Sequence, residues 1–291
     1  MDWARAKTIL ILLLLTTNLI IAATIVVRVA GGGADRGFYD DVTKILESRG
    51  VIVQNGFPKE ITDSGLLIYG DGGRFVDNCA KALNTAGAGS DGSGSGNESG
   101  SGSDAGRVAQ MLGRESLRYV NPNPDEALNI TSITVLDAAV RRILADWGID
   151  IAGFATDYAA QQNSGGYLLQ YILVFEGNKV FDSRFIVEVD AFGGITGILI
   201  NYRDIKAVSP DKEMDISPAY QILLKNYYSD AVISSIDIGF MGQNTMRDNP
   251  FIESEEGAVW RVRLDDGSER FFEAAYGDEI FHSTVIDHAQ N

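Results

Sequence analysis

The most continuous apolar stretch of the chain covers residues 8–27, which hold no charged side chain. Thirteen of these twenty residues are Ile, Leu or Val. A helix rises about 1.5 Å per residue, so twenty residues span about 30 Å, the thickness of the hydrocarbon core of a bilayer. The pattern therefore predicts a transmembrane helix. A cleaved signal peptide is the alternative, but its apolar region is usually shorter, about 7–15 residues, and residues 27–30, Val-Arg-Val-Ala, make a poor cleavage site.

Basic residues near this segment indicate its orientation. Arg5 and Lys7 precede it, and only Arg28 follows closely. Because basic residues favour the cytoplasmic side, we expect a cytoplasmic N-terminus and extracytoplasmic domains at the cell membrane.

Beyond the anchor, the spacing of apolar residues changes repeatedly between helical and strand periods. Helical spacing predicts helices over 38–49 and 134–147 and a third from Ser217 onward, with Thr134 and Asp137 as a capping pair and Pro218 at the first helical position. Alternating or continuous apolar runs predict strands at 51–53, 66–69, 116–120, 167–175, 180–189, 195–202, 236–241, 258–264 and 269–274. Glycines at 50, 148, 177, 193 and 267 mark the ends of helices and the turns between strands.

This pattern predicts an α+β fold in which antiparallel sheets are each packed with helices. Residues 85–106 are almost entirely Gly, Ser, Ala, Asn and acidic residues, so we expect a disordered insertion there. The predicted divisions are an anchor region at 1–30, a first extracytoplasmic domain at 31–126, and a second at 127–291 that contains two similar helix-plus-strands units, 130–205 and 216–282.

Charge restricts the partners of these domains. The chain has a net charge of −16, and residues 1–28 hold three basic residues and one acidic residue. The remainder therefore carries 21 Lys and Arg against 39 Asp and Glu. Such a surface repels nucleic acids and anionic lipid head groups, so we expect no nucleic-acid partner. Cys79 is the single cysteine, which excludes an intramolecular disulfide and a cysteine-based metal site.

Residue combinations that support catalysis are sparse in this sequence. The two histidines, His282 and His288, lie in the last ten residues, where chains commonly fray. Ser209 to Lys212 match Ser-x-x-Lys but lack the further elements of penicillin-binding enzymes, and Pro210 favours a loop. Residues 70–73, Gly-Asp-Gly-Gly, lack the rest of a phosphate loop and are interpreted as a turn.

Two further groups of residues have both a structural and a functional interpretation. Glu253, Glu255 and Glu256 lie near Asp248 without the spacing of a calcium loop, so we interpret them as a solvated loop rather than a cation site. Aromatic residues around the last predicted hairpin are interpreted as core rather than as a binding site; they are Trp260, Phe271, Phe272 and Tyr276. The sequence therefore predicts no enzyme, no cofactor and no metal.

The centre of the predicted anchor holds three polar residues, Thr16, Thr17 and Asn18. Such side chains commonly hydrogen-bond to another helix within the membrane, at about 0.6 kcal/mol each. The alternative is that threonine hydroxyls bond back to carbonyls of their own helix. These three residues are the candidate partner contact.

Several segments resemble one known family. Residues 1–9, Met-Asp-Trp-Ala-Arg-Ala-Lys-Thr-Ile, run into an anchor with Asn18-Leu19 and resemble the start of the YycI family. Residues 171–182 are similar to the strand–turn–strand of that family. Residues 260–262 with 274–280 are similar to its closing hairpin, which also resembles PepSY-type modules. The likeness covers the first thirty residues and about 130–282, and the tract at 85–106 departs from it.

The resemblance implies a regulatory role without catalysis. Members of the family are single-pass accessory proteins of the WalK/WalR (YycG/YycF) two-component system of low-GC Gram-positive bacteria. They act with the related YycH protein on the sensor histidine kinase, through membrane helices and outer domains, and so tune cell-wall metabolism. Two alternatives stay open: a PepSY-like peptidase-inhibitor or ligand-binding module that uses the concave side of the C-terminal sheets, and a wall-processing hydrolase, which needs a pocket with convergent acids or a metal.

Overall fold

The structure is a computed structural model, and it describes residues 33–58, 63–86, 107–124, 128, 130–242 and 255–283. The predicted anchor at 8–27, with Thr16, Thr17 and Asn18, lies outside these residues. Among the described helices, none combines the length and the apolar character that a membrane crossing needs.

The described residues form a mixed α+β fold with four helices, one large sheet and one small sheet. The helices are α2 (Gly33–Ser48), α3 (Gly73–Ala86), α4 (Ile133–Asp146) and α5 (Ala219–Asn226). The strands are β1 (Val51–Val53), β2 (Asp63–Tyr69), β3 (Val108–Met111), β4 (Ser116–Val120), β5 (Phe154–Gln161), β6 (Tyr167–Phe175), β7 (Asn178–Val189), β8 (Ile195–Asn201), β9 (Ile205–Asp215), β10 (Ala231–Phe240), β11 (Glu255–Glu256), β12 (Ala258–Leu264), β13 (Glu269–Glu273) and β14 (Glu279–Ser283).

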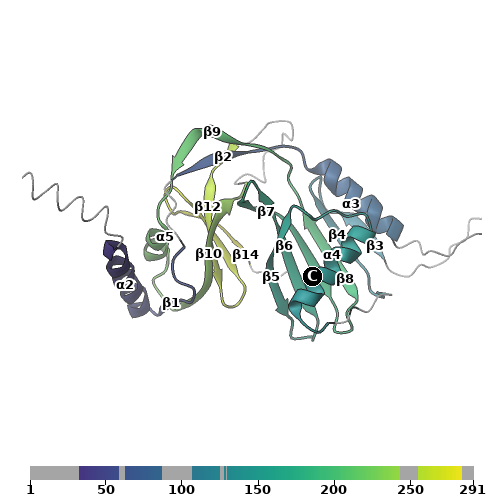
Figure 1. Cartoon of the computed structure of the whole chain (residues 1–291), viewed down its shortest axis with the longest axis horizontal. Helices are drawn as coiled ribbons and strands as arrows, with labels where there is room; N and C mark the ends of the chain where they lie inside the picture. The colour runs from purple at the N-terminus through teal and green to yellow at the C-terminus, as the bar shows by residue number, and fades with distance from the viewer. Residues whose placement is uncertain are drawn as a thin grey trace, which may run out of the picture.

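The large sheet consists of two antiparallel halves joined at one point. Its strand order is β14-β13-β12-β10-β7-β8-β4-β3, with β5 and β6 branching from β7 and β1 pairing with β10 (Figure 1). The junction between the halves is a short parallel contact, in which Gly239 pairs with Lys179 and Phe240 with Val180. The small sheet, β11-β2-β9, is separate from both.

Residues before α4 contribute to both halves. Strand β1 pairs with β10 in the half that carries α5, whereas β3 and β4 extend the half that carries α4. Helix α2 packs against α5, and α3 packs against β3 and β4. The segment that the sequence analysis assigned to a first domain therefore shares one sheet with the segment assigned to the second.

Each half has its own hydrophobic core beneath its helices. In the half with α4, side chains from α3 and α4 meet one face of β4, β6, β7 and β8; Val76, Leu83, Val140 and Phe185 are fully or almost fully buried. In the other half, α2 and α5 cover β10, β12 and β13, where Trp260 and Phe272 are buried.

The helices and strands predicted from periodicity are all present, with ends that differ by a few residues. Gly50 and Gly148 follow α2 and α4 with positive φ, as predicted, but the predicted N-terminal caps are wrong. Ser132, not Thr134, caps α4, and its hydroxyl accepts a hydrogen bond from Val135 N at 3.2 Å. Pro218 is the N-cap of α5 rather than its first helical residue, and the Ser217 hydroxyl instead donates to the carbonyl oxygen of Ala275 at 2.6 Å.

Periodicity missed α3, β3, β5, β9, β11 and β14. Ser209 to Lys212 lie in β9 and not in a loop. The register against β2 shifts between Ser64 and Leu66, from Met214 to Ser209, so Pro210 falls where ladder hydrogen bonding is interrupted. The expected insertion at 85–106 begins too early, because residues 85 and 86 end α3; its remainder lies outside the described residues.

Candidate functional site

A group of charged side chains with a buried centre lies where the two halves of the sheet face each other. We call it the buried ion cluster, and its members are Asp157, Lys179, Arg184, Asp237, Arg261, Arg263 and Glu269. They come from β5, β7, β10, β12 and β13. The side chains of Asp157, Arg261 and Glu269 are at most 1% exposed.

Arg261 lies at the centre of the buried ion cluster. Its two terminal nitrogens donate to the two oxygens of Asp157, Nη1 to Oδ2 at 2.6 Å and Nη2 to Oδ1 at 2.7 Å. Its Nε donates to Asp237 Oδ2 at 3.0 Å, and Nη1 also donates to Glu269 Oε1 at 3.0 Å. The guanidinium carbon lies 4.6 Å from the ring centre of Phe181, so the cation is enclosed on every side by partners.

Local irregularities in the strands bring these groups together. Thr156 pairs with Tyr171 and Tyr158 with Gln170, so Asp157 is the extra residue of a β-bulge, and a bulge redirects its side chain. Along β12, Trp260 and Val262 enter the core under α5. Arg261 and Arg263 therefore point to the opposite face, toward the other half of the sheet.

The surroundings keep the three carboxylates of the cluster ionised. Burial by itself would raise the pKa of Asp157, but the hydrogen bonds and charge of Arg261, with Arg263, outweigh it and hold that pKa well below its usual range. Burial is likewise outweighed at Asp237 by Arg261 and at Glu269 by Arg184, so both carboxyl pKa values are lowered. These three carboxylates, held as anions and paired with cations from both halves, join the two halves of the sheet.

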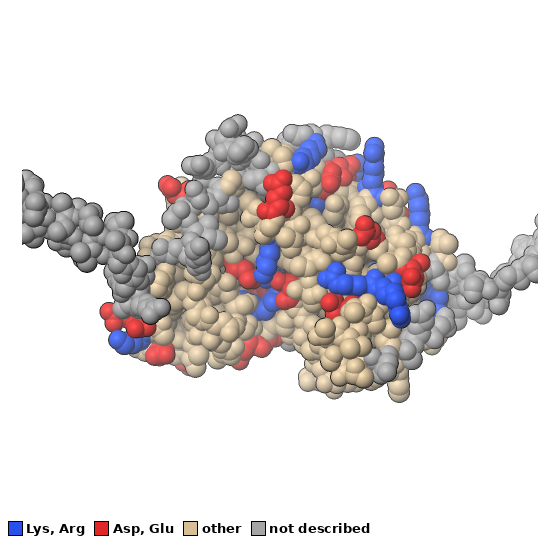
Figure 2. Space-filling view, in the orientation of Figure 1, with Lys and Arg blue, Asp and Glu red and all other residues tan. Residues whose placement is uncertain are grey.

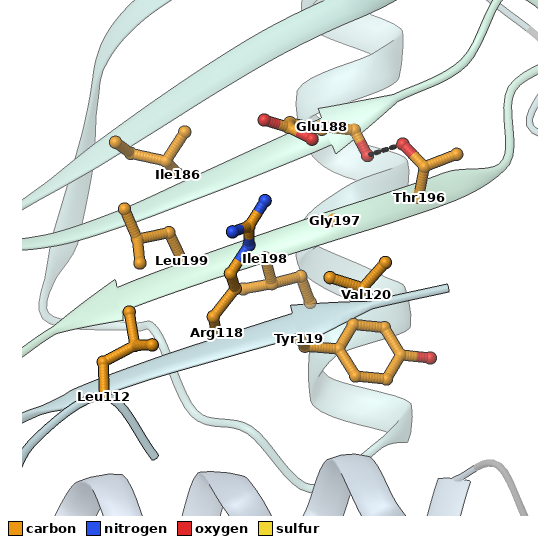
Figure 3. Close-up of a pocket in the computed structure, with 10 residues that line it drawn as sticks. All are labelled: Leu112, Arg118, Tyr119, Val120, Ile186, Glu188, Thr196, Gly197, Ile198 and Leu199. Atoms are coloured by element: carbon orange, nitrogen blue, oxygen red, sulfur yellow. Dashed lines mark hydrogen bonds between the residues drawn. The ribbon is translucent and has the colours of Figure 1, made fainter. Parts of the chain in front are cut away.

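A shallow hollow lies on the face of the α4 half that the helices leave uncovered. Its volume is about 150 Å³, and it is lined by Leu112, Arg118, Tyr119, Val120, Ile186, Glu188, Thr196, Gly197, Ile198 and Leu199 (Figure 3). The register places Gly197 between Val120 and Glu188 on neighbouring strands. A Cβ built at Gly197 would lie 2.7 Å from Glu188 Oε2, so this glycine forms the floor of the hollow.

The hollow has the chemistry of a binding surface. The Thr196 hydroxyl donates to the carbonyl oxygen of Glu188 at 3.4 Å, and apolar side chains of Ile186, Leu199 and Val120 form most of the wall. A space of about this size holds one apolar group of the size of benzene. Its lining residues include no cysteine, histidine or paired carboxylates beside the Thr196 hydroxyl.

Residues 70–73 form the turn between β2 and α3, and their amides are already in use. Gly73 N donates to Asp71 Oδ1 at 3.0 Å, and Gly72 N to Glu115 Oε1 at 3.4 Å. Asp71 is also ion-paired with Arg114. Burial raises the pKa of Glu115. With two carboxylates at these amides, the turn is unsuited to phosphate, as the sequence indicated.

The other sequence candidates are scattered. Thr16, Thr17, Asn18, Asp248, Glu253 and His288 lie outside the described residues, and His282 is part of β14. Glu255 and Glu256 form β11 opposite Ile68 and Leu67, so the expected loop is wrong there. In the part of the chain that the structure describes, no group of three potential metal ligands comes together. Of the aromatic residues, Trp260, Phe271 and Phe272 are buried as expected, whereas Tyr276 is 73% exposed, so its assignment to the core is wrong.

Sequence reasoning missed the buried ion cluster. One pattern pointed to it: residues 259–264, Val-Trp-Arg-Val-Arg-Leu, alternate large apolar residues with arginine in a strand, and Glu269 follows across the hairpin. Elsewhere the charges mix: on the face drawn in Figure 2, basic and acidic side chains lie next to one another. This face presents no broad basic surface for nucleic acid.

Comparisons with known proteins find similarity among solved structures only. No family model matches the chain, and no curated protein matches it. A solved structure, the Bacillus megaterium YpeB C-terminal domain, is similar with a TM-score of 0.39 and 12% identity, covering 71% of this chain and 96% of that one.

Proposed function

We propose that this chain is a non-enzymatic, membrane-anchored protein that modulates a sensor histidine kinase of a cell-wall-controlling two-component system. The observation that carries the proposal is the N-terminal sequence, residues 1–9 running into the uncharged segment 8–27, which resembles the YycI family. In this proposal the N-terminus is cytoplasmic, the α+β domains are extracytoplasmic, and the partners are the kinase and a YycH-like protein.

The described residues support binding more than catalysis. Catalytic acids and bases need shifted pKa values in an accessible cleft. Here the carboxyl groups with strongly lowered pKa values, such as Asp157, are enclosed in ion pairs between strands. A domain held together in this way is suited to presenting a fixed surface to a partner protein.

The anchor is tested by exchange. Replacing residues 8–27 with an unrelated transmembrane segment of equal length should abolish regulation, measured as phosphorylation of the response regulator, if the anchor carries the partner contact. The finer variant replaces Thr16, Thr17 and Asn18 together with Leu, and a matched control replaces Leu12, Leu13 and Leu14 with Ile. All variants must be present in the membrane at equal abundance. Unchanged regulation by the chain with the exchanged anchor would contradict the proposed helix–helix contact.

A second candidate function is a PepSY-like extracytoplasmic ligand-binding or peptidase-inhibitor module. The hollow over Gly197 favours it. In the other half of the sheet, the face that points away from α2 and α5 is covered, because Val259 of β12 packs there against Ile172 of β6 and Phe181 of β7. Substituting Gly197→Leu fills the hollow. Loss of inhibition of a co-expressed extracytoplasmic peptidase would support this function, and inhibition equal to that of the unaltered chain would count against it.

A further inference from the structure

Helices α2 and α5 lie side by side over the half of the sheet that contains β10 and β12 (Figure 1). The ring of Phe38 in α2 meets the ring of Tyr220 in α5 edge-on, with 4.9 Å between the ring centres. Just beyond the other end of α2, Arg49 Nη1 donates to the carbonyl oxygens of Leu224 at 2.8 Å and Tyr227 at 3.2 Å. The two helices are therefore joined near both ends of α2, and they share one boundary.

Large apolar side chains are exposed along this boundary. Phe38 is 47% exposed, Ile45 is 45% exposed, and Tyr228, which follows α5, is 69% exposed. Phe38 and Ile45 are two helical turns apart, so they lie on the same side of α2. Arg49 is one turn beyond Ile45, and its guanidinium carbon lies 5.2 Å from the ring centre of Tyr228. We call Phe38, Ile45 and Tyr228 the exposed stripe, because exposed apolar groups that gather in one place mark an interaction surface.

The charges beside the exposed stripe are balanced, although the chain as a whole is acidic. Asp41 borders the stripe and is ion-paired with Lys44 at 3.1 Å. Arg49 lies at the Tyr228 end, and the carboxylate of Asp230 lies against the next residue of the chain. Two further acids lie on nearly the opposite side of α2, about 200° around the helix from the stripe: Asp40 and Glu47. The stripe is therefore an apolar surface without an excess of negative charge.

The predicted anchor limits the distance between this surface and the membrane. Residues 28–32 separate the uncharged segment 8–27 from Gly33, the first residue of α2. A chain extends by at most about 3.3–3.6 Å per residue, so residues 27 and 33 are at most about 20 Å apart. Head groups occupy about 5–8 Å of that distance. The end of the molecule that carries α2, opposite to β3 in Figure 1, is therefore the end that the anchor holds beside the bilayer.

We propose that the exposed stripe lies in the head-group region of the membrane, on the side where the extracytoplasmic domains follow the anchor. The inference rests on the proposed function in one respect, the anchor at 8–27. Tyrosine is enriched at membrane–water interfaces, and Phe and other large apolar residues form the membrane-facing side of interfacial helices. The lipid is zwitterionic, because an acidic chain is repelled by anionic head groups. This contact fixes the orientation of both halves of the sheet relative to the bilayer.

The probe is a dye at position 45 of the full chain, reconstituted into phosphatidylcholine vesicles. Ile45→Cys carries the dye, and Cys79 stays unlabelled because it is buried in α3 and burial raises the pKa of its thiol to about 12. Glu47→Cys, on the other side of the same helix, is the matched control. A spin label on the lipid acyl chains, next to the head group, quenches dyes at that depth. Interfacial helices are buried by about 5–10 Å, so we expect at least about twofold quenching at position 45 and less than about 10% at position 47.

A second pair of variants tests the rest of the exposed stripe. Phe38→Ser combined with Tyr228→Ser removes apolar contact on both sides of the dye at position 45. We expect this double substitution to lower the quenching there at least about twofold, because binding at the interface scales with the apolar area that is buried. Asp40→Ser, on the other side of α2, is the control and should leave the quenching unchanged. Circular dichroism verifies that each variant is folded.

An alkaline wash of the vesicles separates the anchor from the stripe. Release of the chain by the wash overturns the anchor and this inference together. A retained chain without quenching at position 45, or with equal quenching at positions 45 and 47, overturns the inference alone. A dye at position 45 that is shielded from aqueous iodide but is not quenched by the lipid also overturns it, because a protein surface, such as a second copy of the chain, then covers the stripe.

Discussion

Asp157 and Arg261 lie 104 residues apart in the chain and form a two-bond ion pair in its interior, at 2.6 and 2.7 Å. Both side chains are 1% exposed. Asp157 belongs to β5 of one half of the sheet and Arg261 to β12 of the other. The pair therefore joins two halves whose direct main-chain contact is limited to two residue pairs of β7 and β10.

Removing the charge of Asp157 should destabilise the fold strongly. In Asp157→Asn the side chain keeps its size, but Arg261 and Arg263 lose the carboxylate that compensates their burial. Breaking a buried ion pair from one side costs about 3–5 kcal/mol in free energy of unfolding, measured by urea denaturation. The control is Asp41→Asn, whose exposed pair with Lys44 at 3.1 Å should change the free energy by less than about 0.5 kcal/mol. Equal effects of the two substitutions would contradict the assigned role of the pair.

Stability should fall in acid because of the same cluster. The pKa values of Asp157, Asp237 and Glu269 are lower in the folded chain than in the unfolded chain. Their contribution is therefore complete above the unfolded values of about 4 and is lost as the pH falls through the lower folded values. Urea denaturation at a series of pH values should show the free energy of unfolding decreasing below about pH 4. The Asp157→Asn variant should show a smaller decrease; an unchanged slope would argue against this origin.

Gly193 should be irreplaceable at its turn. Its φ is +91°, and a Cβ there would lie 2.3 Å from the carbonyl oxygen of Leu128. Gly56, with φ +69° and open space around it, is the matched control. We expect Gly56→Ala to cost about 1–2 kcal/mol from backbone strain alone, and Gly193→Ala to cost at least about 1–3 kcal/mol more from the clash. Thermal unfolding followed by circular dichroism measures both, and equal shifts in melting temperature would refute the clash.

Cys79 should be inert while the chain is folded. Its side chain is buried in α3, and burial raises the pKa of its thiol to about 12. Because the thiolate is the reactive form, labelling by an aromatic disulfide reagent at pH 8 should proceed only through unfolding. We expect complete labelling in concentrated urea and a rate at least about 100-fold lower in native buffer. Rapid labelling of the native chain would show that α3 opens locally.

Local sequence patterns predicted much of the fold but little of the candidate site. Apolar periodicity located α4 and the strands from β6 to β8, since each has one face committed to a core. It missed α3. The buried residues of that helix, Val76, Cys79 and Leu83, are separated by polar residues and lie next to the Gly- and Ser-rich tract, so their helical spacing was not recognised. The hollow over Gly197 was equally hidden, because a missing side chain forms a cavity only between particular neighbours on adjacent strands.

The sequence by itself determined the α+β class, the helix and strand segments with strong periodicity, the acidic net charge, and the expectation of an anchor at 8–27. Tertiary structure alone decided that residues on both sides of position 126 share one sheet, that β3 forms its edge, and that Asp157 meets Arg261. Periodicity records which face of an element is buried. It carries no information on which distant strand, brought close by a bulge and by sheet register, supplies the opposite charge.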